Sequence, residues 1–313
     1  MKVLFRLPLT VIALATVAFF GSCKKDSTNP TTPVTPPTAL QNFISADTSL
    51  SVFNAAIQRA GNSTLYAGTD SVTILAPTND AFRAQGITTT TINSMSATAV
   101  DSLLRYHFID SSSHLTAGSY TSFNSKLGPV IYGYGNTDGS SNYFNGSLAV
   151  KQTISGSNAT LYKLSAPLQI PYTSTDMLFA SDSSLTYFAE AVKHSGISLT
   201  PAGASQWNTI LAPTNSAFIA AGYPTLASID SVNAGTLNSI IQYHIIPGQY
   251  FTNSFNGLTT VGSSEGNNIG LTFNNGMAQF IGTSNTTAAG ITTSNRLAGS
   301  NTIVQNINGV LMK

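Results

Sequence analysis

Apolar side chains recur at helical spacing in two separate segments, residues 47–61 and 182–196. In each, an Asp that can cap a helix comes first, Leu and Phe follow at intervals of three residues, and a glycine ends the pattern. A short apolar run of β type lies after each segment, at 73–76 and 209–212, and a proline ends it. Both parts of the chain are therefore predicted to begin with a helix and a short strand.

Further along each part, the pattern changes from helical spacing to short alternation. Stretches rich in Thr, Asn and Gly carry alternating runs such as 148–150 and 271–273. These runs predict antiparallel strands joined by turns. Helices come first and strands later, which favours an α+β fold over a wound parallel sheet.

The two parts are copies of one unit. Residues 73–82 return as 209–218 with nine of ten residues identical, and 103–107 return as 240–244. We also match 158–163 with 308–313; on that match the second copy lacks part of its last strand, or the chain is shortened at its end. The sequence predicts two domains, which we place at residues 40–172 and 173–313.

These motifs resemble those of the fasciclin family, the FAS1 domain of fasciclin, periostin and related adhesion proteins. The resemblance implies two tandem fasciclin-like domains, each a helical segment packed on an antiparallel β-sandwich or wedge, with a role in binding or adhesion. It also implies family-motif positions that are mainly structural. They are Thr78, Asn79, Tyr106 and His107 in the first copy, and Thr214, Asn215, Tyr243 and His244 in the second.

The Tyr-His pairs allow two interpretations. In animal fasciclin proteins such a pair with aliphatic flanks is implicated in integrin binding. However, Val100, Leu103, Leu104 and His107 fall at i, i+3, i+4 and i+7 on one helical face, so the imidazole continues an apolar stripe. We favour a hydrogen-bonded core histidine, and the same holds for His244.

The beginning of the chain predicts export and lipid anchoring. Lys2 and Arg6 precede a short apolar stretch, and small residues lead to Cys23, the only cysteine. The block 20–23 resembles a bacterial lipobox, which implies a signal peptide at 1–22 and a diacylated Cys23 as membrane anchor. Residues 23–39 are rich in Pro and Thr and predict an extended tether. Lys24 favours the outer membrane, and this start is similar to lipoproteins of the Bacteroidetes.

Composition excludes some partners and cofactors. Without residues 1–22 the chain has 291 residues with 11 basic and 12 acidic side chains, which gives no electrostatic basis for binding nucleic acid. The four histidines have no spacing suited to a shared metal, and no glycine loop fits a phosphate cofactor. We therefore expect no metal, no cofactor and no catalytic residue, and a binding partner that is an unidentified protein or glycan.

Two further segments bear on function. Residues 262–266 match the G-x-S-x-G pattern of serine hydrolases, but no helix-forming segment follows Ser264. Residues 133–146 are expected to form a long loop on which Tyr143 and Phe144 are candidate contact residues. The alternative is that the aromatic side chains of this loop cover the core of their own domain. Besides an adhesion module, a hydrolase of envelope or extracellular polymers and a structural spacer or accessory subunit of an outer-membrane complex remain alternatives.

Overall fold

The computed structural model describes the chain except residues 1–37, 62–70, 112–113, 153, 155–157 and 204. The predicted signal peptide, Cys23 and nearly all of the tether lie outside the described residues. Residues Pro37–Lys313 form one compact unit, and it contains both copies of the repeat. Within the described part of the chain, no helix has the length and apolar character needed to cross a membrane.

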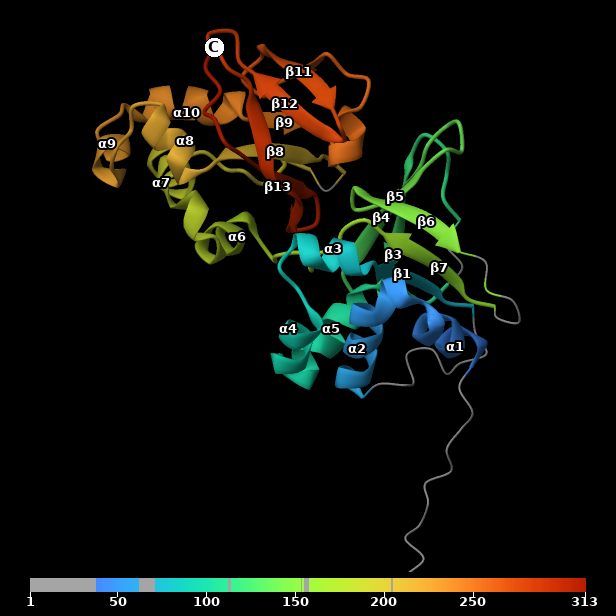
Figure 1. Cartoon of the computed structure of the whole chain (residues 1–313). Helices are drawn as coiled ribbons and strands as arrows, with labels where there is room; N and C mark the ends of the chain where they lie inside the picture. The colour runs from blue at the N-terminus through green and yellow to red at the C-terminus, as the bar shows by residue number, and fades with distance from the viewer. Residues whose placement is uncertain (1–37, 62–70, 112–113, 153, 155–157, 204) are drawn as a thin grey trace, which may run out of the picture. The chain divides into compact units, whose positions relative to one another are not determined.

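The first domain places its helices before most of its strands (Figure 1). In chain order its elements are α1 (Ala39–Ala46), the 3-10 turn η1 (Thr48–Leu50), α2 (Ser51–Ala60), β1 (Thr73–Pro77), α3 (Asn79–Ala84), α4 (Thr89–Ser94), α5 (Ala97–Tyr106), β2 (Phe108–Ile109), β3 (Tyr120–Asn124), β4 (Val130–Gly135), β5 (Asn142–Phe144), β6 (Ser147–Gln152) and β7 (Thr160–Leu164).

Helix α2 begins and ends as its sequence predicts. The Asp47 carboxylate accepts a hydrogen bond from the backbone N–H of Ser49, which starts the η1 turn that leads into the helix. Gly61 ends the helix with φ +63°, in the left-handed region that glycine enters without steric cost.

The seven strands of the first domain form one sheet in the order β2-β1-β7-β6-β5-β4-β3. All of the neighbouring pairs are antiparallel except one, because β7 returns beside β1 and runs parallel to it, with Thr73 opposite Thr160. The α+β class is confirmed, and the sheet is mixed rather than purely antiparallel.

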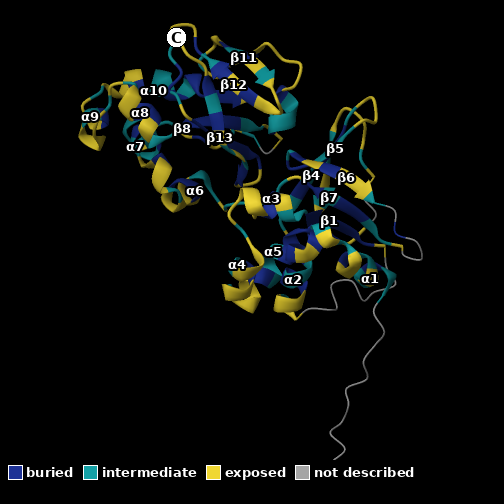
Figure 2. Cartoon of the chain, in the orientation of Figure 1, coloured by how far each residue is buried: buried dark blue, intermediate teal, exposed yellow. Residues whose placement is uncertain are grey.

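Strand β1 is buried on both faces, so it separates two apolar clusters. Ile74 and Ala76 face the cluster formed with helices α1, α2, α4 and α5, while Leu75 faces a second cluster with Tyr106 and Phe144. Figure 2 shows the buried residues gathered in the strands and on the inner helix surfaces. The double burial explains why 73–76 is apolar at every position except Thr73.

The second domain repeats this arrangement. In chain order its elements are α6 (Thr175–Ser181), the 3-10 turn η3 (Ser183–Leu185), α7 (Thr186–Ser195), β8 (Asn208–Pro213), α8 (Asn215–Ala220), α9 (Leu226–Asp230), α10 (Ala234–Tyr243), β9 (Ile245–Pro247), the 3-10 turn η4 (Thr252–Phe255), β10 (Thr260–Gly262), β11 (Asn268–Asn274), β12 (Met277–Ile281), β13 (Ala289–Ala298) and β14 (Thr302–Ile307). The strand order is β10-β11-β12-β13-β14-β8-β9, with β14 parallel to β8.

The expected match between 158–163 and 308–313 is wrong. Thr160 lies opposite Thr73, and Ile303 lies opposite Thr209, the equivalent of Thr73, so β7 corresponds to β14. The closing strand of the second domain is therefore present. Residues 308–313 follow it, as 165–168 follow β7.

The expectation of a long loop at 133–146 is also wrong. The end of β4 and the whole of β5 lie in this segment, at 133–135 and 142–144, so only residues 136–141 form a connecting loop. Strand β5 leads to β6 through a two-residue turn of Asn145 (φ +46°) and Gly146 (φ +77°). Because side chains alternate along β5, Phe144 points into the core and is 0% exposed, whereas the neighbouring Tyr143 is partly exposed. Phe144 is therefore not a surface contact residue.

Each domain also has an ion pair that ties its first 3-10 turn to its closing strands. Lys163 on β7 lies 2.5 Å from the Asp47 carboxylate. In the second domain Asp182 pairs with Arg296, which is almost fully buried, and also accepts a hydrogen bond from the Asn306 amide. An ion pair thus links the 3-10 turn at the start of each domain to the sheet of that domain.

Phe144→Ala should lower the free energy of unfolding by about 3–5 kcal/mol, because it leaves a cavity between Phe123 and Tyr162. Tyr143→Ala, one residue away on the other face, is the matched control and should cost no more than about 1 kcal/mol. Urea unfolding of both variants measures the difference. Equal costs would contradict the placement of these two side chains.

Candidate functional site

Each Tyr-His pair holds its histidine inside the domain. His107 Nδ1 lies 2.8 Å from the carbonyl oxygen of Leu103, and its Nε2 accepts a hydrogen bond from the backbone N–H of Leu168 at 2.9 Å. A backbone N–H can only donate, so the proton is on Nδ1, which donates to Leu103. The imidazole therefore links the end of α5 to the segment that follows β7.

His244 makes the same two bonds in the second domain. Its Nδ1 donates to the carbonyl of Ile240 at 2.8 Å, and its Nε2 accepts from the N–H of Leu311 at 2.9 Å. Burial lowers the pKa of both His107 and His244 to about 4, so both rings are neutral at pH 7. Both are 0% exposed, so neither ring is at the surface of this structure.

The tyrosines of the pairs are buried as well. The Tyr106 hydroxyl donates to the carbonyl of Val130 at 3.2 Å and accepts from the Asn145 amide at 2.9 Å, and burial raises its pKa. The Tyr243 hydroxyl donates to the carbonyl of Asn268 at 3.0 Å. Each hydroxyl thus joins the last residue of a helix to the sheet.

The threonine and asparagine of the first motif organise the start of α3. Thr78 caps the helix by accepting from the N–H of Ala81. Asn79 accepts from the N–H of Val52 and donates to the carbonyl of Thr48, so its amide bridges α3 and the η1–α2 junction. In the second domain, Thr214 and Asn215 make the corresponding bonds, with Ala217, Tyr187 and Ser183 as their partners.

Ser264 lies in the turn between β10 and β11, not between a strand and a helix. The neighbouring Glu265 is engaged by Lys313, Asn267 and Ser239. His244, in the same domain, is fully buried and uses both ring nitrogens on backbone groups. This arrangement does not provide a nucleophile with an adjacent base.

Among the described residues, no group of three His, Cys, Asp or Glu side chains could hold a metal ion.

Aromatic side chains join the two domains within the compact unit. Tyr120 on β3 shares a hydrogen bond with the Ser254 hydroxyl at 2.7 Å, and burial raises the pKa of Tyr120 to about 12. The ring of Phe251 packs between Tyr120 and Tyr132, at centroid distances of 5.4 and 6.2 Å. Tyr132 also meets Trp207 edge to face at 4.9 Å.

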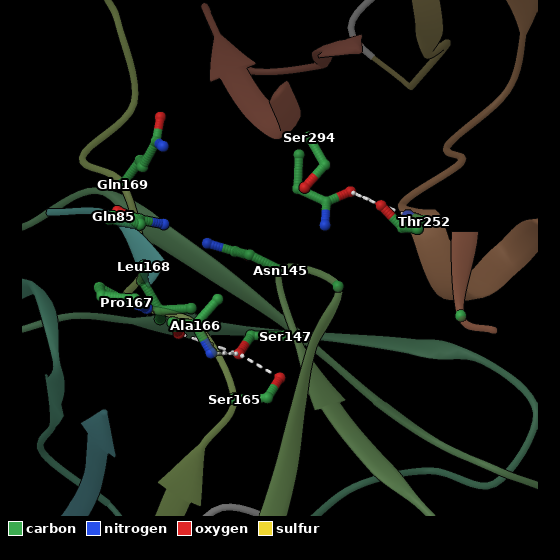
Figure 3. A pocket seen from close by; sticks show the side chains of 13 residues that line it. Gln85, Asn145, Ser147, Ser165, Ala166, Pro167, Leu168, Gln169, Thr252 and Ser294 are labelled. Carbon is green, nitrogen blue, oxygen red and sulfur yellow. Dashed lines mark hydrogen bonds between the residues drawn. The ribbon is translucent and has the colours of Figure 1, made fainter. Parts of the chain in front are cut away.

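A polar cavity of about 210 Å³ lies beside this contact, and Figure 3 shows its lining. It is lined by parts of both domains, and every lining side chain is uncharged. The following residues form it: Gln85, Asn145, Gly146, Ser147, Ser165, Ala166, Pro167, Leu168, Gln169, Thr252, Gly276, Ser294 and Asn295. None of them is predicted from the sequence as a contact residue, because they come from several segments that only the fold brings together.

The sequence matches the family described as Fasciclin domain twice, over residues 48–171 and 183–313. The chain belongs to this family. Fasciclin domains are generally non-catalytic and are associated with adhesion. The two matched ranges coincide with the two structural repeats, so each repeat is one fasciclin domain.

Among solved structures, the chain is similar to a FAS1 domain pair from the insect cell adhesion molecule fasciclin I. The similarity covers 84% of this chain and 96% of that chain, at 15% sequence identity and a TM-score of 0.40. No curated protein matches this sequence.

The fasciclin domains should lose stability as the pH falls from 7 to 5. The pKa of each buried histidine is about 4 in the folded state and about 6.5 when unfolded, so the unfolded chain binds protons first. The stabilisation is present above pH 6.5 and decreases towards pH 4, by about 2 kcal/mol per histidine between pH 7 and pH 5.

Urea unfolding at a series of pH values measures this loss. His107→Ala should be less stable at pH 7 and should remove the contribution of the first domain to the pH dependence. The buried Leu104 on α5 provides the matched control, because Leu104→Ala should lower the stability but leave its pH dependence unchanged. A wild-type stability that is flat between pH 7 and pH 5 would contradict the burial of neutral imidazoles.

Proposed function

We propose that this protein is a lipid-anchored adhesion protein of the bacterial cell envelope, which presents two fasciclin domains to a protein, matrix or glycan partner. The observation that carries this proposal is the double match to a family of adhesion domains, which spans both repeats. The chain would be tethered through Cys23, with residues 24–39 as an extended spacer.

The placement of the chemically reactive side chains supports a binding role over a hydrolytic one. Ser264 is in a hairpin turn, and both motif histidines are engaged inside their domains. In the described residues, the two Tyr-His pairs are thus occupied in holding the fold together. Binding would then use other surfaces.

Anchoring at the outer membrane is supported by the sequence alone. The charged start, the short apolar stretch and the small residues before Cys23 favour processing and acylation of this thiol. Lys24 follows in place of the Asp that commonly signals retention at the inner membrane. We therefore place the protein at the outer membrane.

Cys23→Ser should leave the protein exported but shift it from the membrane fraction to the soluble envelope fraction, because stable attachment needs the acyl chains. Ser22→Ala, which keeps a small residue before the cysteine, is the control and should remain membrane-bound. Fractionation followed by immunoblotting measures both. A Cys23→Ser protein that still partitions with membranes would refute lipid anchoring.

Adhesion itself can be tested in cells that lack the endogenous protein. Cells that express the full chain should adhere to protein- or polysaccharide-coated surfaces better than cells that express a chain without residues 40–313, at equal surface amounts of lipoprotein. Cells that express the Cys23→Ser chain should adhere no better than the deletion. Equal adhesion by all three would overturn the proposed function.

A further inference from the structure

One strand of the second domain has two extra residues that its counterpart in the first domain lacks. Strand β6 pairs with β7 without interruption from Ala149 to Gln152. Strand β13, the equivalent of β6, shifts its register against β14 twice, between Ile291 and Thr293 and between Thr293 and Arg296, and the second shift contains Asn295. A β-bulge of this kind redirects a side chain and is frequent beside binding sites.

The bulge places Asn295 in a conformation that non-glycine residues rarely adopt. Its φ is +59°, and the Gln305 side chain holds it there by accepting from its backbone N–H and donating to its Oδ1. The same Oδ1 accepts from the backbone N–H and the hydroxyl of Thr252. Backbone strain that is held by several specific bonds is concentrated at functional sites.

The amide nitrogen of Asn295 remains available for a ligand. In the part of the chain that the structure describes, Nδ2 has no recorded acceptor, although Oδ1 receives three hydrogen bonds. Gly146 lets the Asn295 side chain lie close to the backbone of the first domain, because a Cβ at position 146 would lie only 2.5 Å from Nδ2. Asn295 thus lines the polar cavity together with the Asn145-Gly146 turn of the first domain.

Other uncharged polar groups surround the same space. Figure 3 shows Gln85, Gln169 and Ser294 around the cavity. No hydrogen bond of these three side chains to the described residues is recorded. They therefore provide amide donors, amide acceptors and a hydroxyl without any formal charge.

We propose that this cavity binds one neutral sugar residue of a glycan. Sugar hydroxyls both donate and accept hydrogen bonds, so they match a mixed lining of amides and hydroxyls. The residues that line it include no cation to neutralise a phosphate or carboxylate, which disfavours anionic ligands. A cavity of about 210 Å³ is smaller than the ~300–1,000 Å³ typical of pockets for drug-sized ligands, so it suits a single ring.

The inference rests on the proposed adhesive function and specifies its partner as a glycan. Pro167 and Ala166 offer a small apolar floor for the C–H face of the sugar, and no aromatic ring is among the described residues that line the cavity. Affinity for a single sugar is therefore expected in the millimolar range, and adhesion would use many anchored copies on one surface.

The test is a titration of the purified full chain with the methyl glycosides of glucose, galactose, mannose and N-acetylglucosamine, followed by saturation-transfer NMR and calorimetry. At least one of them should bind saturably. Glucuronic acid and glucose 6-phosphate should bind at least about tenfold more weakly, because their charge would be left unpaired in the cavity.

Three variants locate the binding. Ser294→Tyr should fill the cavity and abolish binding, and Gln169→Ala should raise Kd by about threefold to tenfold, the usual effect of one neutral hydrogen bond. Gln279→Ala, an exposed glutamine on β12 outside the cavity, should leave Kd unchanged. If Ser294→Tyr does not fold, Gln169→Ala, which removes an amide outside the core, decides the question.

The proposal is overturned if no neutral sugar of the panel binds, if the anionic sugars bind as tightly, or if binding persists unchanged in Ser294→Tyr or Gln169→Ala. Its failure is distinguishable from failure of the adhesive function. Adhesion that survives while the cavity variants lack sugar binding would retain the adhesive role and reject this cavity as its contact site. Sugar binding without any adhesion would retain the cavity as a sugar site and reject the adhesive role.

Discussion

A neutral, fully buried imidazole closes each of the two domains. His107 donates a hydrogen bond to a backbone carbonyl of α5 and accepts one from the backbone N–H of Leu168. His244 makes the equivalent bonds to a carbonyl of α10 and to the N–H of Leu311. No apolar side chain could replace it, because the two backbone groups it satisfies are of opposite polarity and would be left unpaired in the core. The helices, the sheet and the segment after the last strand are joined at this ring.

Local signals predicted much of the fold. The helical stripe before Gly61, the caps at Asp47 and Asp182 and the duplication itself all agree with the structure because each depends on neighbouring residues. The closing strand was misassigned for the opposite reason. Its position is set by parallel pairing across the whole domain, with β1 in the first domain and β8 in the second. The similarity between 158–163 and 308–313 reflects only a short stretch of sequence.

The cavity could not be predicted from the sequence for a further reason. The pair Asn145-Gly146 is typical of a tight turn, but the residues around Asn295 do not predict a bulge. The bulge exists because Gln305 on the neighbouring strand supplies the bonds that hold it. It is a local difference between copies of one fold, since the same sheet position is regular in β6 and irregular in β13.

The parallel pairing of the first and last long strands has a consequence for biosynthesis. Thr73 near the start of the first domain's sheet is matched by Thr160, and Thr209 in the second by Ile303, so the central pair joins residues that are synthesised far apart in time. Contacts of such long sequence separation slow folding, because a large loop must close before they form. A chain that is still emerging therefore lacks the strand that completes its sheet.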